Sequence, residues 1–178
     1  ELPLDDPKVY SYFQRGWNGD VFHFGAKGLT GYCKMLKPDN ITELVNCIGL
    51  YRPGVMEGNF HNEYILRKKG EREVSFRKGA GEILQSSRYI MIWQEQTMKM
   101  FQVLGGFNLV DADGARRAIG KKNVEKLQPF RERFLKNYIE NFGVDQKYAE
   151  ETWKEIENMA DYQFNHCVSG KTVILRGG

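Results

Sequence analysis

The chain has 178 residues and a mass of 20.7 kDa; 41% of its residues are hydrophobic and 28% are charged, so it is long enough to bury a core. Its 26 basic and 23 acidic residues leave a net charge of +3, which excludes a bulk polycation that packs nucleic acid. Three irregularly spaced cysteines argue against a disulfide scaffold or a zinc ribbon, and no apolar run reaches the roughly 18 to 20 residues of a membrane span.

The first half of the chain has the pattern of short amphipathic helices. Asp6 followed by proline is a typical helix start, and the helix that it opens is expected to end at Gly16. Residues 20–24 alternate in a way that predicts a short strand. Asn40 with Glu43 three residues later predicts a capped helix start. Helices are expected over residues 29–36, 41–51 and 59–69.

The second half also reads as helical. Residues 89–92 form an apolar run that fits either a buried strand or the start of a helix, followed by helical spacing as far as Leu104. Further helices are expected over residues 110–119, 124–142 and from the Asp145 cap to about residue 159. The fold class expected is mainly α, with no internal domain boundary before residue 166.

Charge is unevenly distributed along the chain. Residues 64–88 hold seven basic and three acidic side chains, and residues 116–136 hold eight basic and two acidic ones. Residues 140–161 reverse the sign, with seven acidic and two basic side chains. This segregation is typical of a protein that faces phosphates on one side, although solvated helix faces also produce charge runs.

The densest basic element contains Arg116, Arg117, Lys121 and Lys122 with no acid between them. Guanidinium groups match phosphate oxygens in pairs, and the glycine at position 120 lets the chain turn so that both ammonium groups approach the same anion. A solvated helix end whose cations complement the helix dipole is the alternative.

Weaker candidates lie elsewhere. Arg52 stands before a rigid Pro-Gly turn and could point in a defined direction, or simply mark a helix stop. Residues 94–96, Gln-Glu-Gln, could offer hydrogen bonds to a base or sugar, or form an ordinary wet face. His23 and His61 lack a second histidine or cysteine at ligand spacing, so no metal site is predicted.

Residues 104–114 resemble the LAGLIDADG signature of homing endonucleases, in which a helix ends in an acid that binds magnesium. Asp111 or Asp113 would then be that acid. Two extra residues, at 108 and 109, break the register of the signature, and a second copy is absent, so this endonuclease is the secondary hypothesis.

An ordered set of motifs resembles the fingers region of the bacterial DNA polymerase III alpha subunit, a C-family replicative polymerase of bacteria and their phages. The resemblance covers roughly residues 2–166. Its motifs are Val21-Phe22-His23-Phe24, Leu50-Tyr51-Arg52-Pro53-Gly54, Ile65-Leu66-Arg67-Lys68-Lys69-Gly70, Gln94-Glu95-Gln96, Ala112-Asp113 through Lys122, and Tyr162 with Phe164 and Asn165.

This resemblance implies a helical fingers domain that brings the incoming nucleotide to a palm. It implies that the nucleotide-binding residues are Arg116, Arg117, Lys121, Lys122 and Asn165, and that the DNA-binding residues are Arg52, Arg67, Lys68 and Lys69. The implied partners are dNTPs, a DNA primer-template, the remainder of the polymerase and replisome subunits such as a sliding clamp. The palm carboxylates that hold Mg²⁺ in this family would precede Glu1, so the fragment alone is expected to be inactive.

The last twelve residues leave the family pattern and resemble the first block of an intein. Cys167 would be the splicing nucleophile, attacking the carbonyl of His166 to form a thioester. The domains expected are therefore a fingers fragment at 1–166 and a truncated, β-forming intein start at 167–178. The chain opens at Glu1 without a signal peptide, so we expect part of a longer protein in a reducing cytoplasm, with no membrane partner.

Overall fold

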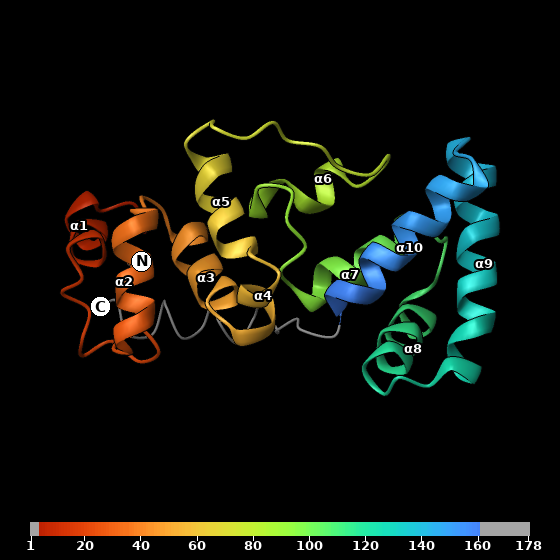
Figure 1. Cartoon of the computed structure of the whole chain (residues 1–178), viewed down its shortest axis with the longest axis horizontal. Helices are drawn as coiled ribbons and strands as arrows, with labels where there is room; N and C mark the ends of the chain where they lie inside the picture. Colours follow the sequence, from red (N-terminus) through yellow and green to blue (C-terminus); the bar gives the residue numbers. More distant parts are fainter. Residues whose placement is uncertain (1–3, 161–178) are drawn as a thin grey trace. The chain divides into compact units, whose positions relative to one another are not determined.

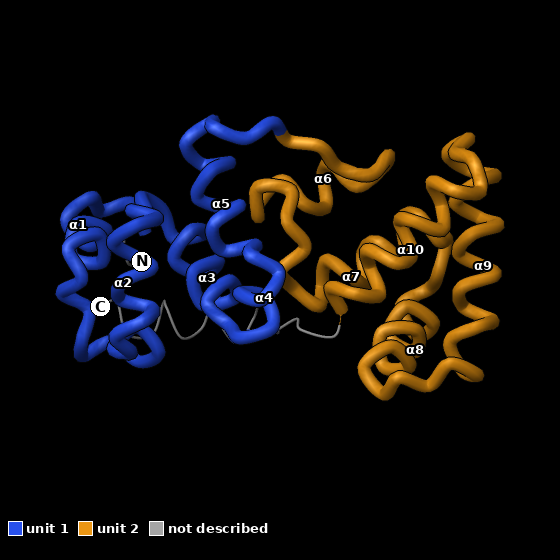
Figure 2. The backbone as a smooth tube through the Cα atoms, in the orientation of Figure 1, with its two compact units in different colours: residues 1–73, 165–178 blue, residues 74–164 orange. Residues whose placement is uncertain are grey.

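The computed structural model describes residues 4–160 of the chain. Every regular element in this range is a helix, which confirms the mainly α class (Figure 1). The chain divides between Glu73 and Val74 into two compact units, a boundary that composition and spacing did not reveal (Figure 2).

Unit 1 contains five helices, each packed against the next along the chain. They are α1 (Pro7–Arg15), α2 (Lys27–Leu36), α3 (Ile41–Leu50), α4 (Pro53–Glu57) and α5 (Phe60–Lys68). The expected caps are present: the Asp6 carboxylate accepts from the N–H of Lys8 at 2.8 Å, and the Asn40 side chain accepts from the N–H of Glu43 at 3.0 Å. Helix α4 was not predicted, because Pro53 fits the first turn of a helix as well as a stop.

The predicted strand at residues 20–24 is wrong, because this segment is a turn. The N–H of Gly25 donates to the carbonyl of Val21 at 3.0 Å, and His23 has a positive φ of 66°. Phe24 is fully buried and packs edge-to-face on Phe13, with ring centroids 4.9 Å apart. A strand needs a partner for its backbone hydrogen bonds, and the described residues offer none.

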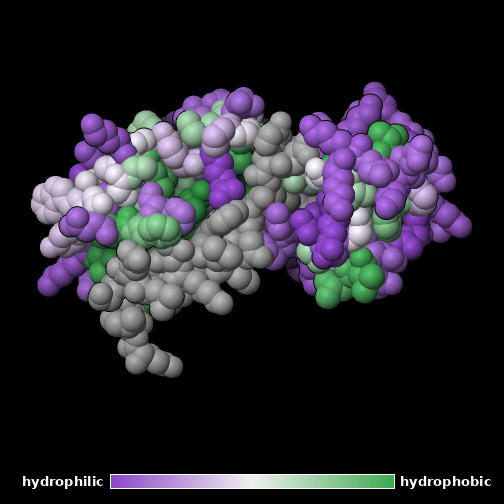
Figure 3. Space-filling model, turned by 90° about the horizontal axis from the view of Figure 1, so that it is seen from below, coloured by the Kyte–Doolittle hydropathy of each residue, from purple (hydrophilic) through white to green (hydrophobic). Residues whose placement is uncertain are grey.

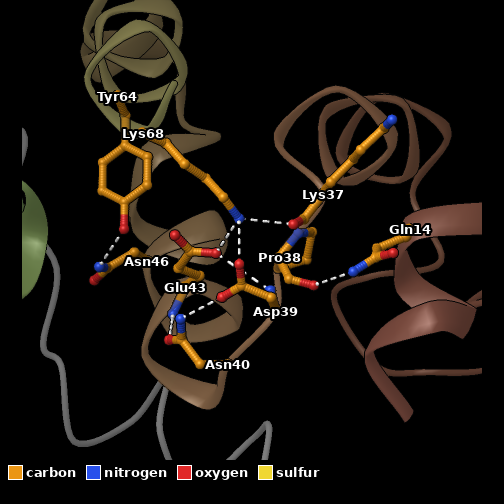
Figure 4. A network of polar contacts seen from close by, with 9 residues as sticks. All are labelled: Gln14, Lys37, Pro38, Asp39, Asn40, Glu43, Asn46, Tyr64 and Lys68. Carbon is orange, nitrogen blue, oxygen red and sulfur yellow. Dashed lines mark hydrogen bonds and ion pairs between the residues drawn. The ribbon is translucent and has the colours of Figure 1, made fainter. Parts of the chain in front are cut away.

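A polar network ties α5 to α3 and to the turn that precedes α3 (Figure 4). The Lys68 ammonium lies 2.5 Å from a carboxylate oxygen of Glu43 and 3.2 Å from one of Asp39, and it donates to the carbonyl of Lys37 at 2.7 Å. Glu43 is only 2% exposed, and the Lys68 ammonium compensates its buried negative charge. Partial burial raises the pKa of Asp39, but hydrogen bonds from Lys68 and Asn40 outweigh that effect and lower it below the ordinary value of 3.8.

Unit 2 contains α6 (Gly81–Leu84), the short 3₁₀ helix η1 (Gln85–Ser87), α7 (Gln94–Val103), α8 (Leu109–Gly120), α9 (Val124–Phe142) and α10 (Gln146–Ala160). Its core is aromatic. The ring of Trp153 lies 5.6 Å from that of Phe101 and 5.3 Å from that of Phe134, and all three side chains are at most 1% exposed. Helices α7, α9 and α10 contribute one ring each, so this contact holds the bundle together.

A segment without helix, residues 74–80, crosses the ends of α9 and α10; we call it the strap. The Tyr138 hydroxyl donates to the carbonyl of Lys78 at 2.8 Å, and the N–H of Lys78 donates to the Tyr148 hydroxyl at 2.9 Å. Gly79 has a φ of 84°, and a Cβ there would lie 2.4 Å from the ring of Phe142. Only glycine therefore fits at this position without strain.

The surface is mostly hydrophilic on the face shown in Figure 3, with apolar side chains gathered in separate patches. Exposed large apolar residues include Trp17 at 61% in unit 1 and Val110 at 79% in unit 2. No helix in residues 4–160 combines the length and the apolar character that crossing a membrane requires.

Replacing Lys68 by alanine tests the polar network. The change leaves the Glu43 carboxylate buried without its cation, so the free energy of unfolding of the chain should fall by about 2 to 4 kcal/mol. Urea denaturation followed by circular dichroism measures this change.

The neighbouring Lys69→Ala is the matched control, because Lys69 is exposed. It should shift the free energy of unfolding by no more than about 0.5 kcal/mol. Equal effects of the two substitutions would show that the network does not stabilise unit 1.

Candidate functional site

The predicted basic cluster lies at the end of α8 and in the turn that follows. Helix α8 begins where the Asn108 side chain accepts from the N–H of Asp111 at 2.8 Å. The helix packs against α7 and α9, and its buried residues are Ala112, Ala115, Ala118 and Ile119. A Cβ on Gly114 would lie 3.1 Å from the ring of Phe130 on α9, so the two helices approach closely. Small residues on this face leave the charged residues for the opposite one.

One carboxylate, that of Asp113, holds both predicted arginines. Arg116 donates from Nε and Nη2 to one carboxylate oxygen at 3.1 and 2.7 Å, and Nε of Arg117 lies 2.7 Å from the other oxygen. The spacings i, i+3 and i+4 place the three side chains on one side of the helix. Three charged groups thus keep a net charge of +1, and each guanidinium retains N–H groups for another anion.

The arginines differ in exposure. The Arg117 side chain is 68% exposed and that of Arg116 only 23%, so Arg117 is the more accessible of the two. The hydrogen bond from Arg116, together with the positive charge of both arginines, lowers the pKa of the Asp113 carboxyl below its ordinary value of 3.8 despite some desolvation. Asp113 is therefore ionised at neutral pH and keeps holding both partners.

Two exposed lysines continue the cluster beyond the helix. The N–H of Lys121 donates to the carbonyl of Arg117 at 3.0 Å, and Lys122 adopts a φ of 51° in the turn toward α9. The negative end of the helix dipole favours cations here and disfavours anions. A phosphate at this end must therefore be attracted by the cationic side chains, and several of them are needed to outweigh the helix dipole.

The second acid of α8 is also paired. Asp111 accepts from Arg133 of α9 at 2.8 Å, and this guanidinium lies over the ring of Phe107 with its carbon 4.1 Å from the centroid. Both acids of the endonuclease hypothesis, Asp111 and Asp113, are thus held by arginines. Among the described residues no group of three or more His, Cys, Asp or Glu side chains could hold a metal ion. The acids of α8 do not fit a magnesium site.

The predicted DNA-binding residues lie in unit 1 and differ from one another. Arg67 is paired with Glu63 at 2.9 Å and is 14% exposed, and Lys68 belongs to the polar network described above. Lys69 is exposed beside them. Arg52 is half-buried immediately before α4, and desolvation lowers its pKa. Only Lys69 therefore presents its cation largely to solvent.

Of residues 94–96, the structure gives Gln96 a structural role. The side-chain carbonyl of Gln96 accepts from the N–H groups of Ile92 and Trp93 at 2.8 and 3.0 Å, and its amide donates to Ser87 at 2.6 Å. Gln96 is 7% exposed, so the wet-face alternative does not hold for it. Residues 89–92, for which the sequence allowed a strand or a helix start, are neither: residue 89 belongs to a turn, and residues 90–92 have no regular structure.

Two further predicted site residues, Asn165 and Cys167, lie outside the described residues, as does the whole intein segment at 167–178. Asp113 is the residue whose role was missed, because the only chemical role that the sequence analysis gave it was in the endonuclease hypothesis. Its spacing of three and four residues from Arg116 and Arg117 is the signal that indicates helix-surface ion pairs.

Two comparisons with known proteins point to the same family. The family model of the bacterial DNA polymerase III alpha subunit finger domain matches residues 1–142. The chain is 37% identical over 166 residues to DNA polymerase III subunit alpha of Aquifex aeolicus, covering 93% of the chain and 14% of that relative. It is 37% identical over 170 residues to the subunit of Thermus aquaticus, with 92% and 14% covered, and 32% identical over 180 residues to that of Escherichia coli, with 98% and 15% covered. The chain spans about a seventh of the length of these relatives.

The pairing at Asp113 predicts a pKa that can be measured. In a carbon-13 NMR titration the Asp113 carboxyl should titrate below 3.8, and Arg116→Gln should raise its pKa toward that value. Since the folded pKa is the lower one, the pairing stabilises the fold above the unfolded pKa of about 3.9 and ceases to do so as pH falls through the folded pKa.

Arg133→Gln is the control for this titration, because Arg133 pairs with Asp111 instead. It should leave the pKa of Asp113 unchanged. An Asp113 carboxyl that titrates at or above 3.8 in the unmodified chain would contradict the geometry.

Proposed function

The chain belongs to the bacterial DNA polymerase III alpha subunit family and matches its finger domain, and from this premise we propose that it binds the triphosphate of the incoming nucleotide at the end of α8. The full-length protein would be a DNA-directed DNA polymerase, a nucleotidyltransferase of DNA replication. The fragment by itself would be inactive, since it corresponds to about a seventh of its relatives.

The observation that carries the proposal is the pairing of Asp113 with Arg116 and Arg117. Two flexible side chains are held in one place before any ligand arrives, so less conformational freedom is lost on binding. Guanidinium groups then offer paired N–H donors to phosphate oxygens. Lys121 and Lys122 add two exposed cations in the turn after the helix. Four cations and one carboxylate leave a charge of +3 to oppose the helix dipole.

These residues would serve phosphoryl transfer by position and charge. Neutralising the triphosphate and aligning it are the contributions that cationic side chains make in such reactions. In the full-length polymerase Mg²⁺ would polarise the reacting oxygens, but the acids of α8 do not fit it, so its ligands would belong to another part of the protein. Asn165, outside the described residues, would complete the nucleotide site.

For the DNA primer-template we propose contacts in unit 1, with Lys69 the most accessible cation. Arg52 could contribute from the start of α4. For Arg67 and Lys68 a direct DNA contact would require breaking the ion pairs with Glu63 and Glu43. The remainder of the polymerase, and replisome subunits such as a sliding clamp, would be its other partners.

The endonuclease hypothesis has no observation in its favour, because both candidate acids are engaged by arginines. The intein start is a separate proposal that rests on the sequence of residues 167–178 alone. An alignment that covers 98% of the chain, as with Escherichia coli, necessarily includes part of this segment. The point therefore needs its own experiment.

The double variant Arg116→Ala/Arg117→Ala tests the nucleotide site. Each charge-assisted hydrogen bond contributes about 1.5 to 3 kcal/mol, so binding of inorganic triphosphate to the 178-residue chain should weaken about tenfold or more. Isothermal titration calorimetry measures this affinity. With a primer-template, the slope of log affinity against log salt should decrease by up to about 0.9 for each phosphate group that the variant no longer neutralises.

The matched control is Lys147→Ala/Lys154→Ala, which removes the same charge from exposed positions of α10. It should reduce triphosphate affinity about twofold at most, through the general field alone. If both double variants weaken binding equally, the site on α8 is wrong and only net charge matters.

The intein proposal predicts a reaction at a defined bond. Mixing the chain with a complementary C-terminal intein portion should cleave or join it after His166, because the Cys167 thiol would attack that carbonyl. Mass spectrometry identifies the product. Cys167→Ala should abolish the reaction, and a chain that remains intact in every mixture would remove the proposal.

A further inference from the structure

Unit 1 carries an exposed aromatic pair at the C-terminal end of α1. Tyr12 is 53% exposed and Trp17 is 61% exposed. The other two tryptophans of the chain, Trp93 and Trp153, are 2% and 1% exposed. Trp17 is therefore the exception among the three tryptophans, and its exposed ring together with that of Tyr12 is a candidate binding surface.

The backbone holds Trp17 in place. Helix α1 ends at Gly16, which has a φ of 74°, and the N–H of Trp17 donates to the carbonyl of Tyr12 at 2.9 Å. The two rings meet edge-to-face with centroids 5.6 Å apart. The indole is thus fixed by a helix cap and by a neighbouring ring, so it loses little conformational entropy when a ligand binds against it.

Two cations lie at the end of α1, one over the indole and one beside Gly16. The guanidinium carbon of Arg15 lies 4.9 Å from the ring centroid of Trp17. Lys34 reaches over from α2, since a Cβ on Gly16 would lie 2.2 Å from its Cε and 3.1 Å from its ammonium nitrogen. The carboxylates of Asp5 and Asp6 stand at the opposite end of α1, about 13 Å away for nine helical residues. Asp20 is the acid nearest in sequence.

We propose that single-stranded nucleic acid binds to the stacking patch, which consists of Tyr12, Arg15, Trp17 and Lys34. An unpaired base would lie on the indole, and backbone phosphates would lie at the two cations. Aromatic side chains beside cations are how proteins bind single strands without sequence preference. Duplex bases are stacked on one another and cannot offer their faces. The patch belongs to unit 1 and shares no residue with α8, so the inference does not rest on the triphosphate site.

The charge of the patch favours this partner over a protein surface. Arg15 lies over the indole ring and Lys34 lies beside Gly16, the residue before Trp17, whereas lysine is depleted at protein interfaces. A strand supplies both missing elements at once, a flat aromatic face for the indole and anions for Arg15 and Lys34.

Fluorescence of the 178-residue chain tests the patch, because Trp17 is the exposed indole among its three tryptophans. Titration with a strand of about 12 deoxythymidines should quench the emission saturably. An abasic strand of equal length, with the same phosphates and no bases, should bind about tenfold or more weakly. A duplex of equal length should not produce the quenching.

Variants are compared by anisotropy of a labelled strand. Trp17→Ala should weaken binding about tenfold, whereas Trp17→Phe, which keeps an aromatic face, should recover most of the affinity. Met35→Ala, at an exposed apolar position of α2, is the matched control and should bind as the unmodified chain does. Circular dichroism melting verifies that each variant is folded.

Three results would overturn the inference. They are equal affinity of Trp17→Ala and the unmodified chain, equal affinity for abasic and base-bearing strands, and self-association that is lost in Trp17→Ala while strand binding is unchanged. The last would make the patch a protein interface. Arg116→Ala/Arg117→Ala should keep the quenching, so failure of the triphosphate site and failure of the stacking patch are distinguishable.

Discussion

Two guanidinium groups can lie side by side on α8 because one carboxylate, that of Asp113, lies between them. Without it, like charges about 5 Å apart near a protein surface would repel by about 1 to 3 kcal/mol, and the long side chains would separate. The pairing depends on helical spacing, so it exists only while α8 is a helix. The local electrostatics of the site thus depend on the stability of one twelve-residue element.

The stability of α8 comes from its surroundings. Its inward residues are small, and the glycine at 114 lets Phe130 of α9 approach closely. Helix α9 in turn packs its Phe134 against Phe101 of α7 and Trp153 of α10. The helices that carry this buried aromatic cluster, α7, α9 and α10, all contact α8 and so support it from its inward face. Because the apolar contacts lie on the inward face of α8, its outward face can carry like charges that a buried core could not accommodate.

Local sequence patterns were sufficient to predict where most helices lie. They were insufficient to predict which partners the polar side chains have. Caps such as Asp6, Asn40 and Asp145 act within three residues, so helix starts could be predicted from the sequence. The strand expected at residues 20–24 and the short helix α4 depend on what packs against them, which alternation and proline do not reveal. Lys68 and Lys69 look alike in the sequence. Only the fold brings Lys68 to Glu43, 25 residues away, and leaves Lys69 in water.

Residues 74–80, the strap, are held differently from every helix around them. Fixing seven residues costs about 7 to 14 kcal/mol of backbone entropy, which two tyrosine hydroxyls, a stacked ring and a few side-chain contacts must offset. Such a segment is the natural first step of local unfolding in unit 2. Its opening would uncover the apolar ends of α7 and α9, while the Asn108 cap and the Asp113 pairing, which involve no residue of the strap, would persist. Unit 2 would then be two cooperative units in amide exchange, with the charged helix in the slower one.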